Sequence, residues 1–302
     1  MYLLEPSPYA RVMEDLSTTL HFLSDKPEET PESTLRALWL KAAGTPVSAE
    51  KAMQTPLPQL TAQQELFLQQ LINQRKQGVP LGHLSGRQSF MGLEFCTDSR
   101  ALLPRKETEL LATKALELLQ FLAGQYSRPK VLDLCCGSGN VGLSLAAHQS
   151  SCRVYCGDLS PEAVELCREN IVQLGLSERA EARVSDLGAA WDLPEYHNSF
   201  HLLTCNPPYI TSSGVDRMDA EIAHKEPRLA FDGGMLGINI MKKLLHEAPR
   251  LLVPKGWLVF ELGAGQGPFM QQLIDKTGHY HNTQSVCDAA GTIRVLATQK
   301  KA

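Results

Sequence analysis

Short apolar runs alternate with amphipathic segments from residue 130 to the carboxyl end of the chain. The runs predict buried strands, and the segments between them repeat apolar residues at helical spacing. Because the last two runs lie close together, the pattern predicts an α/β fold whose mostly parallel sheet ends in an antiparallel pair. The predicted strands cover residues 131–134, 154–157, 182–184, 200–205, 257–262, 280–286 and 292–297.

The residues before this region follow another pattern. Apolar positions recur at helical spacing from Ser33 to Gly44, and a second helix begins at Thr61, whose hydroxyl can cap it. Apolar residues then alternate around Gly92, which predicts a hairpin over residues 89–95. The residues expected on the buried face of the second helix are Leu66, Phe67, Leu71 and Ile72.

These patterns divide the chain into four parts. Residues 1–34 are rich in Pro, Glu, Ser and Thr and predict a short helix with a loose connector. Residues 35–84 form a small helical domain, residues 85–104 a hairpin linker and residues 105–302 the α/β domain. The stretch 210–235 has little periodicity and is typical of a lid or a binding loop.

The composition is that of a globular protein, with 43% hydrophobic and 21% charged residues among 302. The net charge of -4 argues against a large basic surface, so we expect no direct binding of nucleic acid. No run is long enough to span a membrane, and the amino terminus lacks the layout of a signal peptide. We therefore expect a cytoplasmic protein with no membrane partner.

Eight cysteines are present, but no Cys-x-x-Cys pair occurs and the histidines are scattered. Zinc sites and redox motifs both require closely spaced ligands. We therefore expect no metal, and we expect most thiols to be reduced and buried as small hydrophobic side chains.

A glycine-containing turn, residues 135–139, follows the first strand of the α/β domain and leads into a helix, where backbone amides favour a ligand. The turn lacks a Walker lysine, which disfavours a nucleoside triphosphate. Asp158 ends the second strand about 20 residues later, where a carboxylate can accept hydrogen bonds from a ribose diol. Taken alone, Asp158 could equally cap the helix that begins near Pro161.

Two more turns follow strands of the same sheet. After the third strand, an adenine could lie in an apolar slot beside Asp186, although this residue also suits a plain turn. The fourth strand ends at Asn206-Pro207-Pro208-Tyr209, where consecutive prolines stop the strand and stiffen the turn.

This last turn has the chemistry to bind a planar nitrogen, which is a poor nucleophile because its lone pair is delocalised. The Asn206 oxygen and the Pro207 carbonyl can accept its two hydrogens while Tyr209 packs on its plane, which aims the lone pair. Ligands of open α/β sheets bind at this end of the strands. The alternative is an ordinary turn that ends a strand.

The order of Asp133, the glycine turn, Asp158 and Asn-Pro-Pro-Tyr resembles a class I S-adenosylmethionine-dependent methyltransferase that acts on a planar nitrogen. Further segments narrow the resemblance to the HemK/PrmC-type protein-(glutamine-N5) methyltransferases, from about residue 35 to the carboxyl end. These segments are residues 78–86, 90–95, Leu103-Pro104-Arg105 with Thr108-Glu109, and residues 226–230 before 233–234.

That family methylates the glutamine of the Gly-Gly-Gln loop of peptide chain release factors. The resemblance implies a Rossmann-like seven-stranded sheet, a helical substrate-recognition domain and the cofactor S-adenosyl-L-methionine. It implies that Asn206 and the Pro207 carbonyl hold the glutamine amide, in a slot shaped by Pro208 and Tyr209. The implied cofactor-binding residues are Asp133, Cys135, Cys136, Gly137, Ser138, Gly139, Asp158, Leu159, Asp186, Leu187 and Asn206.

The resemblance also gives a role to Arg105 and Glu109, either at the substrate or in holding the linker. Their chemistry alone favours a solvated start of a helix, which Glu107 or Thr108 could cap.

The family usually has Gly-Thr-Gly where this chain has Cys135-Cys136-Gly137. We expect the side chain at position 135 to narrow the pocket, so Cys135→Gly should preserve or improve activity. The first 30 or so residues have no counterpart in the resemblance.

Other functions stay open on the sequence alone. Asn-Pro-Pro-Tyr also occurs in adenine-N6 methyltransferases, which need phosphate contacts and a way to receive the base. The acidic charge and the lack of a basic run disfavour them. A small-molecule N- or O-methyltransferase is a second alternative. A binding protein without turnover is a third, which the intact Asp133, Asp158 and Asn206 disfavour.

Overall fold

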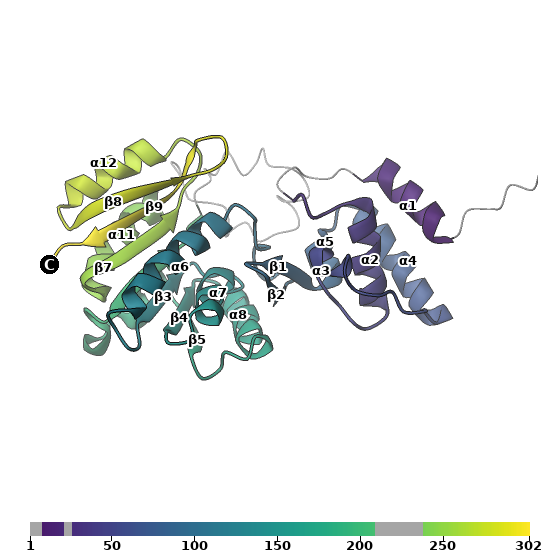
Figure 1. Cartoon of the computed structure of the whole chain (residues 1–302), viewed down its shortest axis with the longest axis horizontal. Helices are drawn as coiled ribbons and strands as arrows, with labels where there is room; N and C mark the ends of the chain where they lie inside the picture. The colour runs from purple at the N-terminus through teal and green to yellow at the C-terminus, as the bar shows by residue number, and fades with distance from the viewer. Residues whose placement is uncertain (1–7, 21–25, 209–237) are drawn as a thin grey trace, which may run out of the picture.

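The computed structural model describes residues 8–20, 26–208 and 238–302. A helical part and an α/β part lie at opposite ends of the molecule, with a two-stranded hairpin between them (Figure 1). Tyr209 and the predicted lid, residues 210–235, lie outside the described residues. No helix among the described residues is both long and apolar enough to cross a membrane.

In the helical part, two helices that pack together each begin with a capping box. Thr30 pairs with Ser33 at one of them, and Thr61 pairs with Gln64 at the other, so the predicted Thr61 cap is confirmed. The helices are α1 (Pro8–Thr19), α2 (Pro31–Ala42), α3 (Ala49–Ala52), α4 (Ala62–Lys76) and α5 (Leu81–Ser85).

The predicted buried face of α4 is partly wrong. Leu71 and Ile72 are buried, but Leu66 is 70% exposed and Phe67 is 39% exposed. The buried stripe instead includes Leu68, because a step of three or four residues from it reaches Leu71 and Ile72.

The amino-terminal segment belongs to the packing of the helical part. Leu16 of α1 is fully buried in the same core as α2 and α4. Glu29 and Arg75 form an ion pair at 3.0 Å in which both side chains are almost inaccessible. The predicted domain boundary at residue 34 falls inside α2, which begins at Pro31. The other predicted domain bounds stay predictions.

The seven-stranded, mostly parallel sheet is confirmed, with its strands in the order β5-β4-β3-β6-β7-β9-β8. β3 to β7 are mutually parallel, and β9 runs antiparallel to both of its neighbours. The strands are β3 (Lys130–Leu134), β4 (Arg153–Asp158), β5 (Ala180–Val184), β6 (Phe200–Cys205), β7 (Leu252–Glu261), β8 (Tyr280–Cys287) and β9 (Ile293–Lys300).

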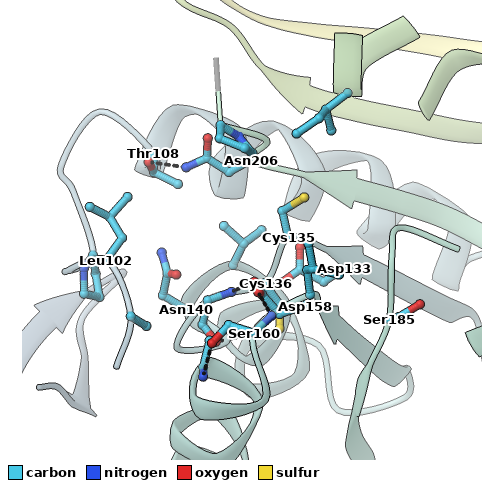
Figure 2. A pocket seen from close by; sticks show the side chains of 18 of the residues that line it. Leu102, Thr108, Asp133, Cys135, Cys136, Asn140, Asp158, Ser160, Ser185 and Asn206 are labelled. Atoms are coloured by element: carbon cyan, nitrogen blue, oxygen red, sulfur yellow. Dashed lines mark hydrogen bonds between the residues drawn. The ribbon is translucent and has the colours of Figure 1, made fainter. Parts of the chain in front are cut away.

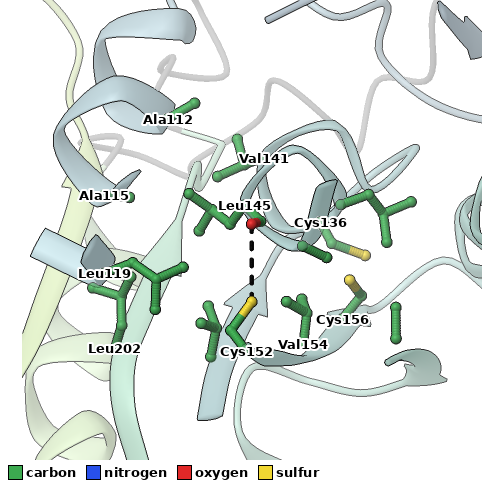
Figure 3. Packing of buried hydrophobic residues seen from close by; sticks show 14 of the residues in the cluster. Ala112, Ala115, Leu119, Cys136, Val141, Leu145, Cys152, Val154, Cys156 and Leu202 are labelled. Carbon is green, nitrogen blue, oxygen red and sulfur yellow. Dashed lines mark hydrogen bonds between the residues drawn. The ribbon is translucent and has the colours of Figure 1, made fainter. Parts of the chain in front are cut away.

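Helices cover both faces of this sheet. Successive residues of a strand point to opposite sides, so the apolar strands place apolar side chains on both faces, and the helices bury them. Val131 of β3 packs in the core beneath α6 (Glu109–Ala123), α7 (Asn140–His148) and α8 (Pro161–Gln173), part of which Figure 3 shows. Leu132 packs in the opposite core, beneath α11 (Asn239–Leu251) and α12 (Gly267–Thr277).

The hairpin of β1 (Arg87–Phe90) and β2 (Leu93–Cys96) confirms the predicted linker strands. Asn170 in α8 ties it to the α/β part. Its side chain accepts a hydrogen bond from the Cys96 amide at 2.7 Å and donates to the Cys96 carbonyl at 3.1 Å. It also donates to the Ser138 carbonyl at 3.0 Å, so one buried amide joins the hairpin to the glycine turn.

The strand order places a crevice next to β3. From β3 the chain builds outward through β4 and β5, and it then returns to add β6 on the other side of β3. The loops that follow β3 and β6 therefore diverge, and open α/β sheets bind their ligands at such a point.

Candidate active site

A cavity lies at the carboxyl ends of β3, β4, β5 and β6 (Figure 2). Its walls come from the turns after these strands, from residues 100–105 and from the starts of α6, α7 and α11. The predicted site residues that line it are Arg105, Asp133, Cys135, Cys136, Gly137, Asp158, Leu159, Asp186, Leu187, Asn206 and Pro208.

Asp133, near the end of β3, is 1% exposed. One carboxylate oxygen accepts from the Gly142 amide of α7 at 2.9 Å, and the other accepts from the Thr204 hydroxyl of β6 at 2.7 Å. Burial raises the pKa of Asp133 to about 7, and these two hydrogen bonds oppose the rise. Asp133 therefore fixes the start of α7 against the end of β6.

The glycine turn has an unusual backbone. Cys135 has a φ of 54°, Gly137 of 53° and Gly139 of 84°, all in the left-handed region. Glycine adopts this region freely, whereas a cysteine there is strained. The strain at Cys135 gives a physical reason for glycine at this position in the family that the sequence resembles.

Asp158 faces this turn from the end of β4. Its carboxylate accepts from the Gly137 amide at 2.8 Å and from the Ser160 amide at 3.0 Å. Burial raises its pKa above the ordinary value, and the backbone hydrogen bonds oppose the rise. The cap of α8 is Ser160, whose hydroxyl accepts from the Ala163 amide, so Asp158 is free of the capping role that the sequence left open.

Ser138 and Gly139 are not among the residues that line the cavity. Ser138 is 1% exposed and its carbonyl accepts from Asn170, so it faces the protein interior. Gly139 lies at the start of α7, where an added Cβ would come within 2.6 Å of the Cys167 sulfur. Both residues shape the turn from behind, and their binding roles stay predictions.

Asp186 and Leu187 lie at the cavity after β5. Leu187 is 5% exposed, whereas Asp186 is largely exposed and forms an ion pair with Lys243 of α11 at 2.6 Å. This pair bridges two sides of the cavity rim. An apolar wall beside a carboxylate is therefore present, as the sequence suggested, but the carboxylate already has a partner.

Asn206 directly follows β6 and is partly buried at the cavity. Its side-chain Nδ2 donates to the Thr108 hydroxyl at 3.2 Å (Figure 2). Pro208 also lines the cavity, whereas Pro207 is buried and is not among the lining residues. The catalytic and substrate-binding roles of this turn, including that of Tyr209 beyond the described residues, stay predictions.

Arg105 and Glu109 are separated by the structure. Arg105 lines the cavity, but Glu109, the first residue of α6, does not. Its carboxylate accepts from the Met91 amide of the hairpin at 2.9 Å and pairs with Lys106 at 3.2 Å. Glu109 therefore holds the linker, which is one of the two roles that the sequence left open.

Several lining residues were missed in the sequence. Asn140 directly follows the glycine turn and Ser160 lies two residues after Asp158, so extending each predicted turn into its helix would have found them. Thr108 belongs to a segment that the resemblance marked, but its only predicted role was that of a cap. Lys243 lies far along the chain from these turns, and no local pattern marks it.

Among the residues that the structure describes, no group of His, Cys, Asp and Glu side chains could hold a metal ion. All eight cysteines are free, and most are buried, as predicted. Cys136 of the glycine turn belongs to the same core as Cys156 and Cys167, which Figure 3 shows in part.

Comparison with known proteins gives consistent relatives. Residues 111–247 match the model of the methyltransferase small domain. The release factor glutamine methyltransferase of Moorella thermoacetica is 36% identical over 232 residues, which cover 77% of this chain and 79% of that protein. The one of Rhodopirellula baltica is 29% identical over 289 residues, which cover 96% of each chain.

Solved structures share the fold. The hMettl16 catalytic domain in complex with MAT2A 3′UTR hairpin 6 aligns with a TM-score of 0.53 at 14% identity, over 75% of this chain and 81% of its own. The human methyltransferase 10 domain containing protein aligns with a TM-score of 0.50 at 16% identity, over 68% and 88%. At such low identity these alignments are evidence about the fold alone. They confirm the predicted class I methyltransferase fold.

Proposed function

The chain belongs to the release factor glutamine methyltransferase family, and we propose that it transfers a methyl group from S-adenosyl-L-methionine to the amide nitrogen, N5, of a glutamine in a peptide chain release factor. The proposed target is the glutamine of the Gly-Gly-Gln loop. The observation that carries the proposal is the position of Asn206, which lines the same cavity as the glycine turn and Asp158.

The residues around the glycine turn fit the proposed cofactor. Asp158 keeps acceptor capacity beyond its two backbone hydrogen bonds, so it can bind ribose hydroxyls. Leu159 and Leu187 line the cavity and offer apolar walls to an adenine. When bound, the cofactor supplies a methyl group on a positively charged sulfur, which is strongly electrophilic.

On the substrate side, the proposed task is to orient a poor nucleophile. The Asn206 Oδ1 and the Pro207 carbonyl would accept the two hydrogens of the glutamine amide, which aims the nitrogen lone pair at the cavity. Fixed acceptors also stabilise the positive charge that develops on the nitrogen during transfer. The extra proton can leave after transfer, so the proposal needs no general base.

The partner and the location follow from the same proposal. Release factors act in the cytoplasm, which is where we expect this enzyme. We also propose that the helical part contacts the release factor, whereas no step of the reaction needs direct contact with nucleic acid.

The first test is a transfer assay with labelled S-adenosyl-L-methionine and an unmethylated release factor. We expect label on the glutamine of the Gly-Gly-Gln loop, located by mass spectrometry, and none on a release factor in which that glutamine is alanine. Asn206→Ala should lower turnover by about a hundredfold or more, because it removes a fixed acceptor at the reacting group.

Cofactor binding by Asn206→Ala, measured by calorimetry, should stay close to that of the wild type. Asn73→Ala is the matched control, because Asn73 is exposed on α4, and it should keep full turnover. If the wild-type enzyme binds the cofactor normally but transfers no label to the wild-type release factor, the release factor is not the substrate.

A further inference from the structure

One hydrogen bond joins the turn after β6 to the start of α6. The Asn206 Nδ2 donates to the Thr108 Oγ1 at 3.2 Å, between residues 98 positions apart in the chain. Figure 2 shows the two side chains facing one another at the edge of the cavity. Among the described residues, the Asn206 side chain makes this one recorded hydrogen bond, which leaves Oδ1 as an acceptor.

The Thr108 hydroxyl is available because Thr108 does not act as a cap. It occupies the cap position of α6, but its φ of -66° and ψ of -15° are already helical, and its side chain makes no capping hydrogen bond. A capping hydroxyl would accept from an amide of the first turn. The sequence-based expectation that Thr108 could cap α6 is therefore wrong, since its hydroxyl bonds to Asn206 instead.

Thr108 is also firmly held. It is 2% exposed, so water competes little for its hydroxyl. Its backbone amide donates to the Arg105 carbonyl at 3.2 Å, and its carbonyl accepts from the Ala112 amide at 3.1 Å. Leu111 and Ala112, which follow it in α6, are fully buried against the sheet.

We propose that Thr108 is a positioning residue of the methyl transfer, which holds the Asn206 amide so that Oδ1 is the group presented to the substrate. This inference rests on the proposed function. A hydroxyl can bond to either end of an amide, so the Thr108 hydroxyl fixes the position and the plane of the Asn206 side chain. With Nδ2 bound to Thr108, the acceptor end stays available for an amide hydrogen of the glutamine.

This role predicts an effect on the reaction step rather than on binding. Without the hydroxyl, the Asn206 amide rotates more freely and spends less time in the productive orientation. Thr108→Val keeps the size and shape of the side chain but removes the hydroxyl. We expect it to lower kcat by about tenfold, which is the effect of losing one hydrogen bond to a reacting-site group, with KM and cofactor Kd within about twofold.

Two comparison variants separate positioning from a loss of structure. Thr108→Ser restores the hydroxyl and should bring kcat back to within about twofold of the wild type. Thr97→Val is the matched control, because the Thr97 hydroxyl is also buried and donates to the Gly82 carbonyl at 2.9 Å, away from the cavity. It should leave kcat unchanged, and thermal melts of all three variants report their folding.

The double variant Thr108→Val with Asn206→Ala gives the sharpest readout. If Thr108 acts through Asn206, the double variant is no slower than Asn206→Ala alone. Wild-type kcat in Thr108→Val, a Thr108→Ser enzyme as slow as Thr108→Val, or an added loss in the double variant would each overturn the inference. Failure of the proposed function looks different, because the wild-type protein would then put no label on the release factor although it binds the cofactor.

Discussion

The two sides of the cavity are held in different ways. On the proposed cofactor side, the Asp158 carboxylate accepts from the backbone amides of Gly137 and Ser160, and all three residues lie at the carboxyl ends of adjacent strands. On the proposed substrate side, Asn206 is held by Thr108, which lies 98 positions away in another element. A backbone turn can therefore fix the cofactor side, whereas the substrate side depends on how α6 packs.

Asp133 connects the two sides. Its carboxylate bonds to the amide of Gly142, which follows the cofactor turn, and to the hydroxyl of Thr204, which precedes Asn206. A change at Asp133 should affect both sides at once, whereas a change at Asp158 should affect the cofactor side alone. Three variants, at Asp158, Asp133 and Cys135, probe the cavity, beginning with the largest expected effect.

Asp158→Ala should weaken cofactor binding. It removes the carboxylate that we expect to bind the ribose and leaves the Gly137 amide without its acceptor. Loss of charged hydrogen bonds of this kind should weaken cofactor binding by about a hundredfold in calorimetry. Asp192→Ala is the matched control, since Asp192 pairs with Arg250 outside the cavity, and its Kd should not change. An Asp158→Ala protein that binds as tightly as the wild type would remove the ribose role.

Asp133→Asn should change the pH dependence of stability. Burial raises the pKa of Asp133 from 3.8 to about 7 on folding, so between these values the folded protein keeps a proton that the unfolded chain releases. Asp133 therefore lowers the free energy of unfolding as the pH rises through this range, by roughly 2 kcal/mol from pH 5 to pH 7. Asparagine does not titrate, so the variant should lack this part of the decline.

Urea denaturation at several pH values measures the effect, as the difference between wild type and variant. Asp275→Asn, on the exposed surface of α12, should keep the pH dependence of the wild type. Parallel pH profiles for wild type and Asp133→Asn would show that Asp133 is ionised in the folded protein throughout this range.

Cys135→Gly should have the smallest effect of the three variants, and we expect it on cofactor binding. A side chain at a φ of 54° costs about 1 kcal/mol that glycine avoids, and the substitution also widens the cavity. We expect cofactor binding at least as tight as in the wild type, with turnover retained. Cys136→Gly is the contrasting variant: Cys136 is 4% exposed in the core, so its loss should destabilise the protein by about 1 kcal/mol or more in thermal melts. Weaker cofactor binding in Cys135→Gly would show that the thiol contributes to the site.

The predictions for the helical part show which features the spacing of apolar residues predicts and which it does not. Thr61 was found as a cap because its hydroxyl bonds within its own turn. The face of α4 was harder, because a run that contains Leu66, Phe67 and Leu68 allows more than one apolar stripe. Packing against α2 selects the stripe that contains Leu68 and leaves Leu66 exposed.

The sequence by itself determined the strands, the order of the turns and most of the proposed cofactor side, because each depends on residues that are near one another in the chain. The glycine turn and Asp158 were found in this way, and Cys135, Cys136, Gly137 and Asp158 line the cavity. Only the tertiary structure decided that Ser138 faces the interior, that Glu109 holds the hairpin and that Thr108 bonds to Asn206. The physical reason is that each of these depends on which distant element packs against the turn, and no local spacing of residues specifies that contact.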